Sequence, residues 1–233
     1  ILYVRDDDTG KLFGPTALPF RHGTGVYVAH HGRGYSRFEH TRYGIALDLL
    51  QFVPIDQSIK LSRLRIRNLS GRTRRLTLTA YVEWVLGTSR SATAPYVATE
   101  MDTVTGGMFV RNLRSAADAR VAFTDLGGHQ TSLTGNRMEF IGRNGSLERP
   151  AGLARSAVLS GRTGAGLDPC GALQTSLVLA ANESIELVWL LGEAATTIEA
   201  QAMIEHWRVA DIDAALQSVR KQWSEVLDAV TVQ

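Results

Sequence analysis

The sequence predicts a mainly β protein, a large antiparallel sandwich followed by a short helical segment. Through most of the first 195 residues, apolar and polar residues alternate with a period of two, and turn signals such as DDDTGK and TGG separate many of the runs. From residue 196 onward, apolar residues recur instead at intervals of three and four, which is typical of amphipathic helices. We therefore expect a β domain over residues 1–195 and a helical linker over residues 196–233.

The predicted strands are short runs rich in residues that favour β structure. They span residues 26–30, 45–54, 59–69, 75–86, 107–111, 120–124, 137–141, 172–179 and 184–191. The runs 59–69 and 75–86 are separated by NLSGRTRR and are expected to pair as an antiparallel hairpin. The alternation in 59–69 slips once near Ser62, which indicates a β-bulge.

Two helices are expected after the strands. The first covers residues 197–208, and the second carries an apolar stripe formed by Ile212, Leu216, Val219, Trp223, Leu227 and Val230. The stripe has two compatible interpretations. It packs on the sandwich, or it leads to a further domain that this chain does not contain.

Composition limits the classes of function. The 233 residues carry a formal net charge of +2, which does not predict a nucleic-acid partner. Apolar runs stay well short of the ~20 residues needed to cross a bilayer. The one cysteine, Cys170, excludes an internal disulfide and is expected to be buried and inert. The chain opens on Ile1 rather than a methionine, so we expect a piece of a longer protein.

The stretch HHGRGYSRFEH, residues 30–40, concentrates three histidines and two glycines. A zinc site needs three or four ligands that converge, whereas neighbouring residues of a strand point to opposite faces. His30 and His40 are able to meet across a hairpin, but no third ligand is evident. The favoured interpretation is two strands joined by a glycine turn, with no metal.

The acidic run DDDTGK is likewise interpreted as a turn, because it lacks the later glutamate of a calcium-binding loop.

No catalytic residue is assigned from the sequence. Carboxylates are present, but their spacing places no two of them at the separation that glycoside hydrolysis requires, and no Gly-x-Ser-x-Gly motif occurs. A mutarotase-like enzyme is the weaker alternative. It would need His40 and either Glu83 or Glu100 on one concave sheet surface.

The segment EWVLGTSRSATAPY, residues 83–96, is the candidate substrate-proximal loop. It is polar but poor in glycine, and such loops often carry function. Its arginine and hydroxyl groups are able to donate to sugar oxygens, and its tryptophan is able to stack on a sugar ring. The candidate residues are Trp84, Arg90, Ser91, Thr93 and Tyr96. The alternative is an ordinary surface loop with Trp84 in the core.

Several long motifs, in this order, carry a resemblance to a known family. They are YVRDDDTGKLFGPTALPF, the stretch from HHGRGYSRFEH to EWVLGTSRSA, FIGRNGSLERPAGL and GAGLDPCGALQ. Together they resemble the N-terminal β-sandwich domain of glycoside hydrolase family 94, formerly glycosyltransferase family 36, and within it the cyclic β-1,2-glucan synthases. The resemblance covers nearly the whole chain. It implies a galactose-mutarotase-like supersandwich that lacks strands upstream of YVRD, and helices that lead to an absent (α/α)₆ catalytic barrel.

The resemblance also implies a function. In the family, the barrel carries the general acid and the phosphate-binding residues, so this chain alone is expected to be non-catalytic, with carbohydrate handling and assembly as its role. It needs no cofactor, and inorganic phosphate is the co-substrate of the parent phosphorylase or glycosyltransferase. A family loop that borders the neighbouring subunit's active site matches the position after EWVLG, which favours Arg90, Ser91, Thr93 and Tyr96 as substrate-proximal.

The expected partners are β-1,2-glucan or its oligosaccharides, the missing barrel and a second copy in a homodimer, with no nucleic acid. The resemblance places the membrane-bound parent at the cytoplasmic face of the bacterial inner membrane, and the fragment itself is expected to be soluble. The alternative function is a purely structural, dimerising domain without sugar affinity.

Overall fold

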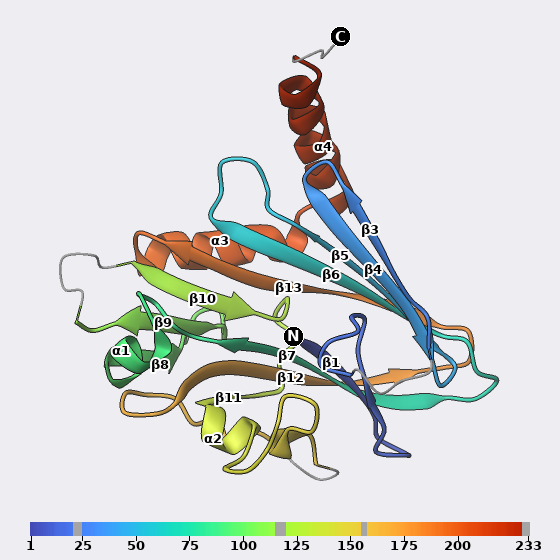
Figure 1. Cartoon of the computed structure of the whole chain (residues 1–233), viewed down its shortest axis with the longest axis horizontal. Helices are drawn as coiled ribbons and strands as arrows, with labels where there is room; N and C mark the ends of the chain where they lie inside the picture. Colours follow the sequence, from blue (N-terminus) through green and yellow to red (C-terminus); the bar gives the residue numbers. More distant parts are fainter. Residues whose placement is uncertain (21–24, 115–119, 155–157, 230–233) are drawn as a thin grey trace.

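Two antiparallel sheets pack face to face in the computed structural model (Figure 1), which describes residues 1–20, 25–114, 120–154 and 158–229. The larger sheet has eight strands in the order β3-β4-β5-β6-β13-β10-β9-β8. The smaller sheet has five, in the order β11-β12-β7-β1-β2. The antiparallel sandwich predicted from the alternation is confirmed.

The strands of the larger sheet are β3 (Tyr27–Gly32), β4 (Tyr35–Arg42), β5 (Ile45–Phe52), β6 (Ile59–Asn68), β8 (Val97–Met101), β9 (Met108–Asn112), β10 (Val121–Asp125) and β13 (Ser184–Ala194). Those of the smaller sheet are β1 (Leu2–Asp6), β2 (Leu12–Phe13), β7 (Arg74–Glu83), β11 (Ser132–Asn136) and β12 (Pro169–Leu179). The helices are α1 (Arg90–Thr93), α2 (Arg137–Phe140), α3 (Thr197–Val209) and α4 (Ile212–Asp228), with 3₁₀ turns η1 (Ala94–Tyr96) and η2 (Ala151–Leu153).

Both faces of the larger sheet are covered near its middle. On the inner face, side chains such as Leu47 and Ile66 pack against Val4 and Leu78 of the smaller sheet. On the outer face, Ile204 and its neighbours in α3 pack in a second core, which also contains residues of β9, β10 and α4. Figure 1 shows α3 lying along this face and α4 projecting beyond the sandwich. The predicted boundary at residue 195 stays a prediction, because α3 shares a core with the strands.

The predicted hairpin between residues 59–69 and 75–86 is wrong. β6 pairs with β5 and β13, whereas β7 pairs with β1 and β12, so the two consecutive strands lie in different sheets. The crossing is held by the buried Asn68, whose amide donates to the carbonyl oxygens of Arg72, Leu179 and Ala180. Leu179 is the last residue of β12 and Ala180 follows it, at the place where the chain crosses to β13 in the other sheet. Alternation shows that both strands bury one face, but it does not show which sheet each joins.

The predicted bulge near Ser62 is also wrong. β6 pairs in an unbroken register with β13 over residues 59–67 and with β5 over residues 61–68. The apolar residues change faces instead. Leu61 belongs to the core under α3, whereas Leu64 and Ile66 belong to the core between the sheets. A strand that is covered on different faces along its length therefore produces the same slip in alternation as an inserted residue.

Residues 137–141, predicted as a strand, begin with helix α2. The side chain of Asn136 caps this helix by accepting a hydrogen bond of 3.1 Å from the backbone nitrogen of Met138. Phe140 and Ile141 are adjacent, yet both are buried in the third core, beneath the smaller sheet. A single helical turn places adjacent residues on one side, which a strand does not.

Four strands were not predicted, β1, β2, β8 and β11. All five residues of β1 are buried, including Arg5 and Asp6, so this strand has no exposed polar face that would produce alternation. β8 and β11 lie at the edges of different sheets, and residues 161–164 connect these edges. Gly135 donates to the carbonyl of Arg162 at 2.7 Å, and Thr99 donates to that of Gly164 at 3.2 Å.

The predicted helices are present. α3 confirms the expected helix over residues 197–208, and Thr196 caps it by accepting a hydrogen bond from Glu199. α4 begins after the capping residue Asp211. Along the stripe of α4, Ile212 and Val219 are buried, whereas Trp223 and Leu227 are exposed; Val230 lies outside the described residues. The stripe is thus buried in its first half, whereas in its second half Trp223 stays partly exposed beside the β3–β4 turn.

Candidate functional site

The stretch HHGRGYSRFEH forms the β3–β4 hairpin, as the two-strand interpretation predicted. His30 pairs with Arg37 and lies 3.5 Å from Glu39. His40 pairs instead with Tyr27, stacks on its ring at 3.7 Å and lies 3.0 Å from the carbonyl of Val26. The idea that His30 and His40 meet is therefore wrong. Within the described residues, no three His, Cys, Asp or Glu side chains gather as metal ligands.

The glycine turn of this hairpin is a contact surface for α4. Gly34 has a φ of +78°, and a Cβ atom added to it would lie 2.4 Å from Cδ1 of Trp223. Next to it, Arg33 donates to both carboxylate oxygens of Asp228 at 2.9 Å. The lack of a side chain at Gly34 therefore makes room for a helix packed from the far end of the chain.

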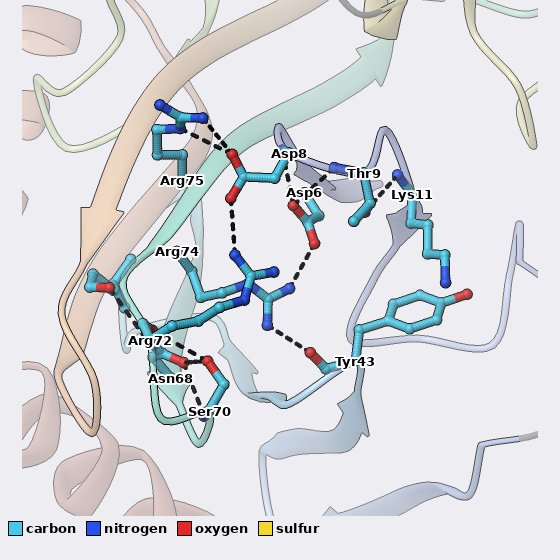
Figure 2. A network of polar contacts seen from close by, with 11 residues as sticks. Asp6, Asp8, Thr9, Lys11, Tyr43, Asn68, Ser70, Arg72, Arg74 and Arg75 are labelled. Carbon is cyan, nitrogen blue, oxygen red and sulfur yellow. Dashed lines mark hydrogen bonds and ion pairs between the residues drawn. The ribbon is translucent and has the colours of Figure 1, made fainter.

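The acidic turn after β1 is held by arginines (Figure 2). Arg74 donates to Asp6 at 2.6 Å, and both side chains are buried. Burial raises the pKa of Asp6, but hydrogen bonds from Arg74 and Thr9 outweigh it and leave the pKa below its ordinary value. Asp8 accepts from Arg75 of β7 and from Arg72 in the loop before that strand. These carboxylates serve as structural ion-pair partners in the turn that the sequence predicted.

The candidate loop after β7 is partly in the core. Trp84 is only 5% exposed and belongs to the core between the sheets, so its ring has no face open for a sugar. Thr93 is buried, and its hydroxyl donates to the carbonyl of Ser89 at 2.8 Å. Ser91 is exposed, and Tyr96 is 40% exposed. Of the predicted substrate-proximal residues, only Ser91 and Tyr96 present their side chains openly to solvent.

Arg90 belongs to a closed ring of two arginines and two carboxylates. It donates to Glu83 at 3.0 Å and to Asp168. Arg137 donates to the same glutamate at 2.8 Å and lies 3.7 Å from the same aspartate. Each side chain is about one-third exposed. The ring ties the loop to the start of α2 and to the residue before β12, which fixes the position of α1.

The charges of the ring affect the pKa of its own member Glu83 and of the neighbouring thiol of Cys170. Burial raises the pKa of Glu83, but hydrogen bonds from Arg137 and Tyr81 and the charge of Arg90 outweigh it, so the pKa lies below its ordinary value. Burial, with the nearby charges of Asp168 and Glu83, raises the pKa of the Cys170 thiol far above its ordinary value. Glu83 is thus held as a carboxylate, and the buried cysteine is held as an unreactive thiol.

The histidine–carboxylate pair of a mutarotase is not brought together. His40 lies in β4, near one edge of the larger sheet, whereas Glu100 lies in β8, the strand at the opposite edge. Glu100 accepts from Arg111 on the adjacent strand, and Glu83 belongs to the smaller sheet. Burial lowers the pKa of His40, and its Nε2 atom has no hydrogen-bond partner among the described residues.

Three residues that contact the candidate loop were not predicted from the sequence, namely Arg137, Asp168 and Arg114. The first two complete the ring, and the guanidinium of Arg114 lies 5.3 Å from the centre of the Tyr96 ring. No spacing rule connects these positions with residues 83–96. Arg137 is 54 residues from Glu83, and Asp168 is 78 residues from Arg90. They meet only because the end of β7 lies beside the starts of α2 and β12.

A cavity of about 420 Å³ opens beside the ring, between the two sheets. Glu83 and Tyr81 line it from the smaller sheet, and Gln51, Lys60 and Trp189 line it from the larger one. Burial lowers the pKa of the Lys60 ammonium. The cavity has apolar walls and few polar groups, as small-molecule sites commonly do.

Residues 1–210 match the model of one protein family, described as the supersandwich domain of glycosyl hydrolase 94. The chain belongs to this family. The match covers both sheets and α3, and it ends before α4. The family resemblance expected from the motifs is thereby confirmed.

The supersandwich domain has relatives of known name. It is 33% identical, over all of its 233 residues, to the cyclic beta-(1,2)-glucan synthase NdvB of Rhizobium meliloti (strain 1021), of which it covers 8%. It is 25% identical over 232 residues to the N,N'-diacetylchitobiose phosphorylase of Vibrio proteolyticus, covering 96% of this chain and 29% of that protein. The chain therefore spans less than a third of the length of these relatives.

Solved structures share the fold. A bacterial glucoamylase complexed with acarbose superposes with a TM-score of 0.63 and 8% identity, over 99% of this chain and 32% of that one. A putative kojibiose phosphorylase from the human microbiome superposes with a TM-score of 0.57 and 7% identity, over 96% and 27%. Within the described residues of the supersandwich domain, no helix is long and apolar enough to cross a membrane.

Proposed function

We propose that this supersandwich domain is a non-catalytic, carbohydrate-handling and assembly part of a cyclic β-1,2-glucan synthase. The observation that supports this proposal most directly is the 33% identity to one such enzyme over the full length of the chain. The parent then acts on β-1,2-glucan with inorganic phosphate as co-substrate and without a cofactor. The parent is membrane-bound, with this domain at the cytoplasmic face.

The protonation of its acids supports a non-catalytic role. An inverting phosphorolysis needs a carboxylic acid that stays protonated near neutral pH to donate to the glycosidic oxygen, and this requires a raised pKa. Hydrogen bonds instead leave the pKa values of Glu83, Asp102 and Glu139 below their ordinary values, despite the opposing effect of burial. These carboxylates are therefore ionised and hydrogen-bonded, which suits positioning better than proton donation.

The loop after β7 supports the carbohydrate-handling role. Tyr96 offers an exposed ring next to a guanidinium, and Ser91 offers an exposed hydroxyl. Aromatic rings and hydroxyl donors are the groups that proteins use against the faces and edges of sugars. Arg90 and Thr93 hold this loop in place through their hydrogen bonds, Arg90 to the two carboxylates of the ring and Thr93 to the carbonyl of Ser89. The loop then borders the substrate when the missing (α/α)₆ barrel, or that of a second copy in a homodimer, lies beside it.

A structural and dimerising domain without sugar affinity is the second candidate. The burial of Trp84 favours it, because the most suitable stacking residue is unavailable. The exposed apolar residues Trp223, Val226 and Leu227 of α4 also favour an assembly role, since large apolar side chains clustered on one helix mark contact surfaces.

Two measurements test the proposal. The purified chain, incubated with β-1,2-linked glucose oligosaccharides and phosphate, is expected to consume no phosphate; formation of glucose 1-phosphate would disprove the non-catalytic role. A calorimetric titration with the same oligosaccharides is expected to show binding that Tyr96→Ala weakens. Met101→Ala, a change at a comparably exposed side chain on the next strand, is the control and should leave the affinity unchanged.

A further inference from the structure

A groove of about 450 Å³ runs along the outer face of the larger sheet, between α4 and the β3–β4 hairpin. Its floor is formed by Leu50 of β5 and Arg63 of β6, and one wall by Leu216 of α4. Tyr35 of β4 lines the opposite side. The volume lies within the range of ~300–1,000 Å³ that is typical of ligand sites. It is separate from the loop after β7, which follows a strand of the other sheet.

Planar charged side chains surround this groove in fixed pairs. Arg37 donates to both oxygens of Asp48 at 2.8 and 2.7 Å. Arg65 donates to Glu186 at 2.6 Å. The nearly buried Arg63 donates to Asp213 of α4 at 2.6 Å. These pairs hold the guanidinium groups in position before any ligand arrives, which reduces the entropy lost on binding.

The pairs leave hydrogen-bonding capacity unused. Among the described residues, Nη1 of Arg37 and Nη1 of Arg65 have no partner. Arg220 of α4 also has no carboxylate partner within the described part of the chain; its guanidinium lies 5.7 Å from the centre of the Tyr35 ring. Donors of this kind, beside the apolar side chains of Leu50 and Leu216, are suited to a ligand with several hydroxyl groups on a largely apolar ring.

The charges of the groove balance. Four guanidinium groups, those of Arg37, Arg63, Arg65 and Arg220, and the carboxylate of Asp213 line the groove. Three carboxylates outside the lining, those of Glu39, Asp48 and Glu186, pair with Arg37 and Arg65. A phosphate or carboxylate ligand would meet no net positive charge, and a cation would meet no net negative charge. The binding of a neutral polyhydroxylated ligand does not depend on a net charge, so the paired charges do not weaken it.

We propose that the groove between α4 and the β3–β4 hairpin binds a short stretch of neutral oligosaccharide. The specific assignment of β-1,2-linked glucose rests on the function proposed above. Sugar rings lie along Leu216 and Tyr35, and Arg220 and the free Nη1 groups donate to their hydroxyls. The site is thus a second contact for the glucan chain, away from the loop that carries Tyr96.

The experiment is a titration of the ¹⁵N-labelled chain with linear β-1,2-glucotetraose, followed by amide chemical shifts. Saturable shifts are expected at residues 35–37, 63–65 and 213–220. Arg220→Ala should weaken binding about tenfold, the scale of one charge-assisted hydrogen bond. Lys221→Ala, the adjacent position on the same helix, is the matched control and should leave affinity unchanged. Both positions are exposed, so both variants are expected to fold, which thermal melting checks.

The Arg220 variant and two further ligands, cellotetraose and glucose 1-phosphate, distinguish failure of the groove from failure of the proposed function. Undiminished binding by Arg220→Ala, or shifts confined to residues 84–96, overturns the groove and leaves the proposed function standing. Binding in the groove of cellotetraose but not of β-1,2-glucotetraose confirms the groove and contradicts the assignment to β-1,2-glucan. Tighter binding of glucose 1-phosphate at the same residues overturns the preference for a neutral ligand. A complete lack of saccharide binding overturns both the groove and the carbohydrate-handling role, and leaves the structural and dimerising domain as the better account.

Discussion

Trp223, on the last helix, packs against Gly34 so closely that a Cβ atom at the glycine would come within 2.4 Å of its indole ring. The glycine sits at φ +78° in the two-residue turn between β3 and β4. Beside this contact, Arg33 forms a two-armed ion pair with Asp228. The hairpin turn and α4 therefore form one unit that projects from the sandwich (Figure 1).

Gly34→Ala is expected to destabilise the fold by about 2 kcal/mol, from the cost of a side chain at positive φ and from overpacking against Trp223. Urea unfolding followed by tryptophan fluorescence measures the loss. Gly71→Ala is the control, because a Cβ atom there would contact nothing within 4 Å. Equal stability of the two variants would contradict the close packing of α4 on the turn.

Arg90→Ala opens the ring of ion pairs and is expected to loosen the loop more than it destabilises the fold. The ring is about one-third exposed, so the unfolding free energy should fall by ~1 kcal/mol. Hydrogen–deuterium exchange at residues 88–96 should rise clearly. Lys221→Ala removes a far more exposed pair with Glu225 and should change neither quantity. Unchanged exchange in Arg90→Ala would show that the ring does not position the loop.

Asp6→Asn breaks the buried ion pair with Arg74 and is expected to cost about 3–5 kcal/mol, because it leaves an uncompensated guanidinium in the interior. Chemical denaturation measures the change. Asp8→Asn in the same turn, whose arginine partners are exposed, should have a much smaller effect. Similar losses in both variants would mean that the turn rather than the buried pair carries the stability.

His40 predicts a dependence of stability on pH. Burial lowers its pKa below the ordinary 6.5, so the folded protein binds fewer protons than the unfolded chain. Its contribution to stability is complete above pH 6.5 and is lost as the pH falls towards the lowered pKa. His40→Gln should therefore lose less unfolding free energy than the wild type between pH 7.5 and pH 5.5. Equal losses in the two proteins would show that His40 does not carry the effect.

Local pattern determined much of the architecture. Alternation identified most of the strands of the larger sheet, because strands such as β5 alternate buried with more exposed side chains along much of their length. A period of three to four located α3 and α4, and the DDDTGK and GRG turns were recognised from residues that tolerate tight turns. The motifs also placed the chain in its family, since long segments in a fixed order are properties of sequence alone.

Tertiary structure decided which elements meet. Whether β6 pairs with β7, whether a slip in alternation is a bulge, and whether Trp84 is exposed all depend on what covers each face. The ring that joins Arg90, Asp168 and Arg137, and the groove beside Arg220, gather side chains from elements far apart in the chain. The periodicity of apolar residues shows only that one face of a strand or helix is buried. The partner that covers it, and the chemistry that results, are set by the packing of the two sheets and the last helices.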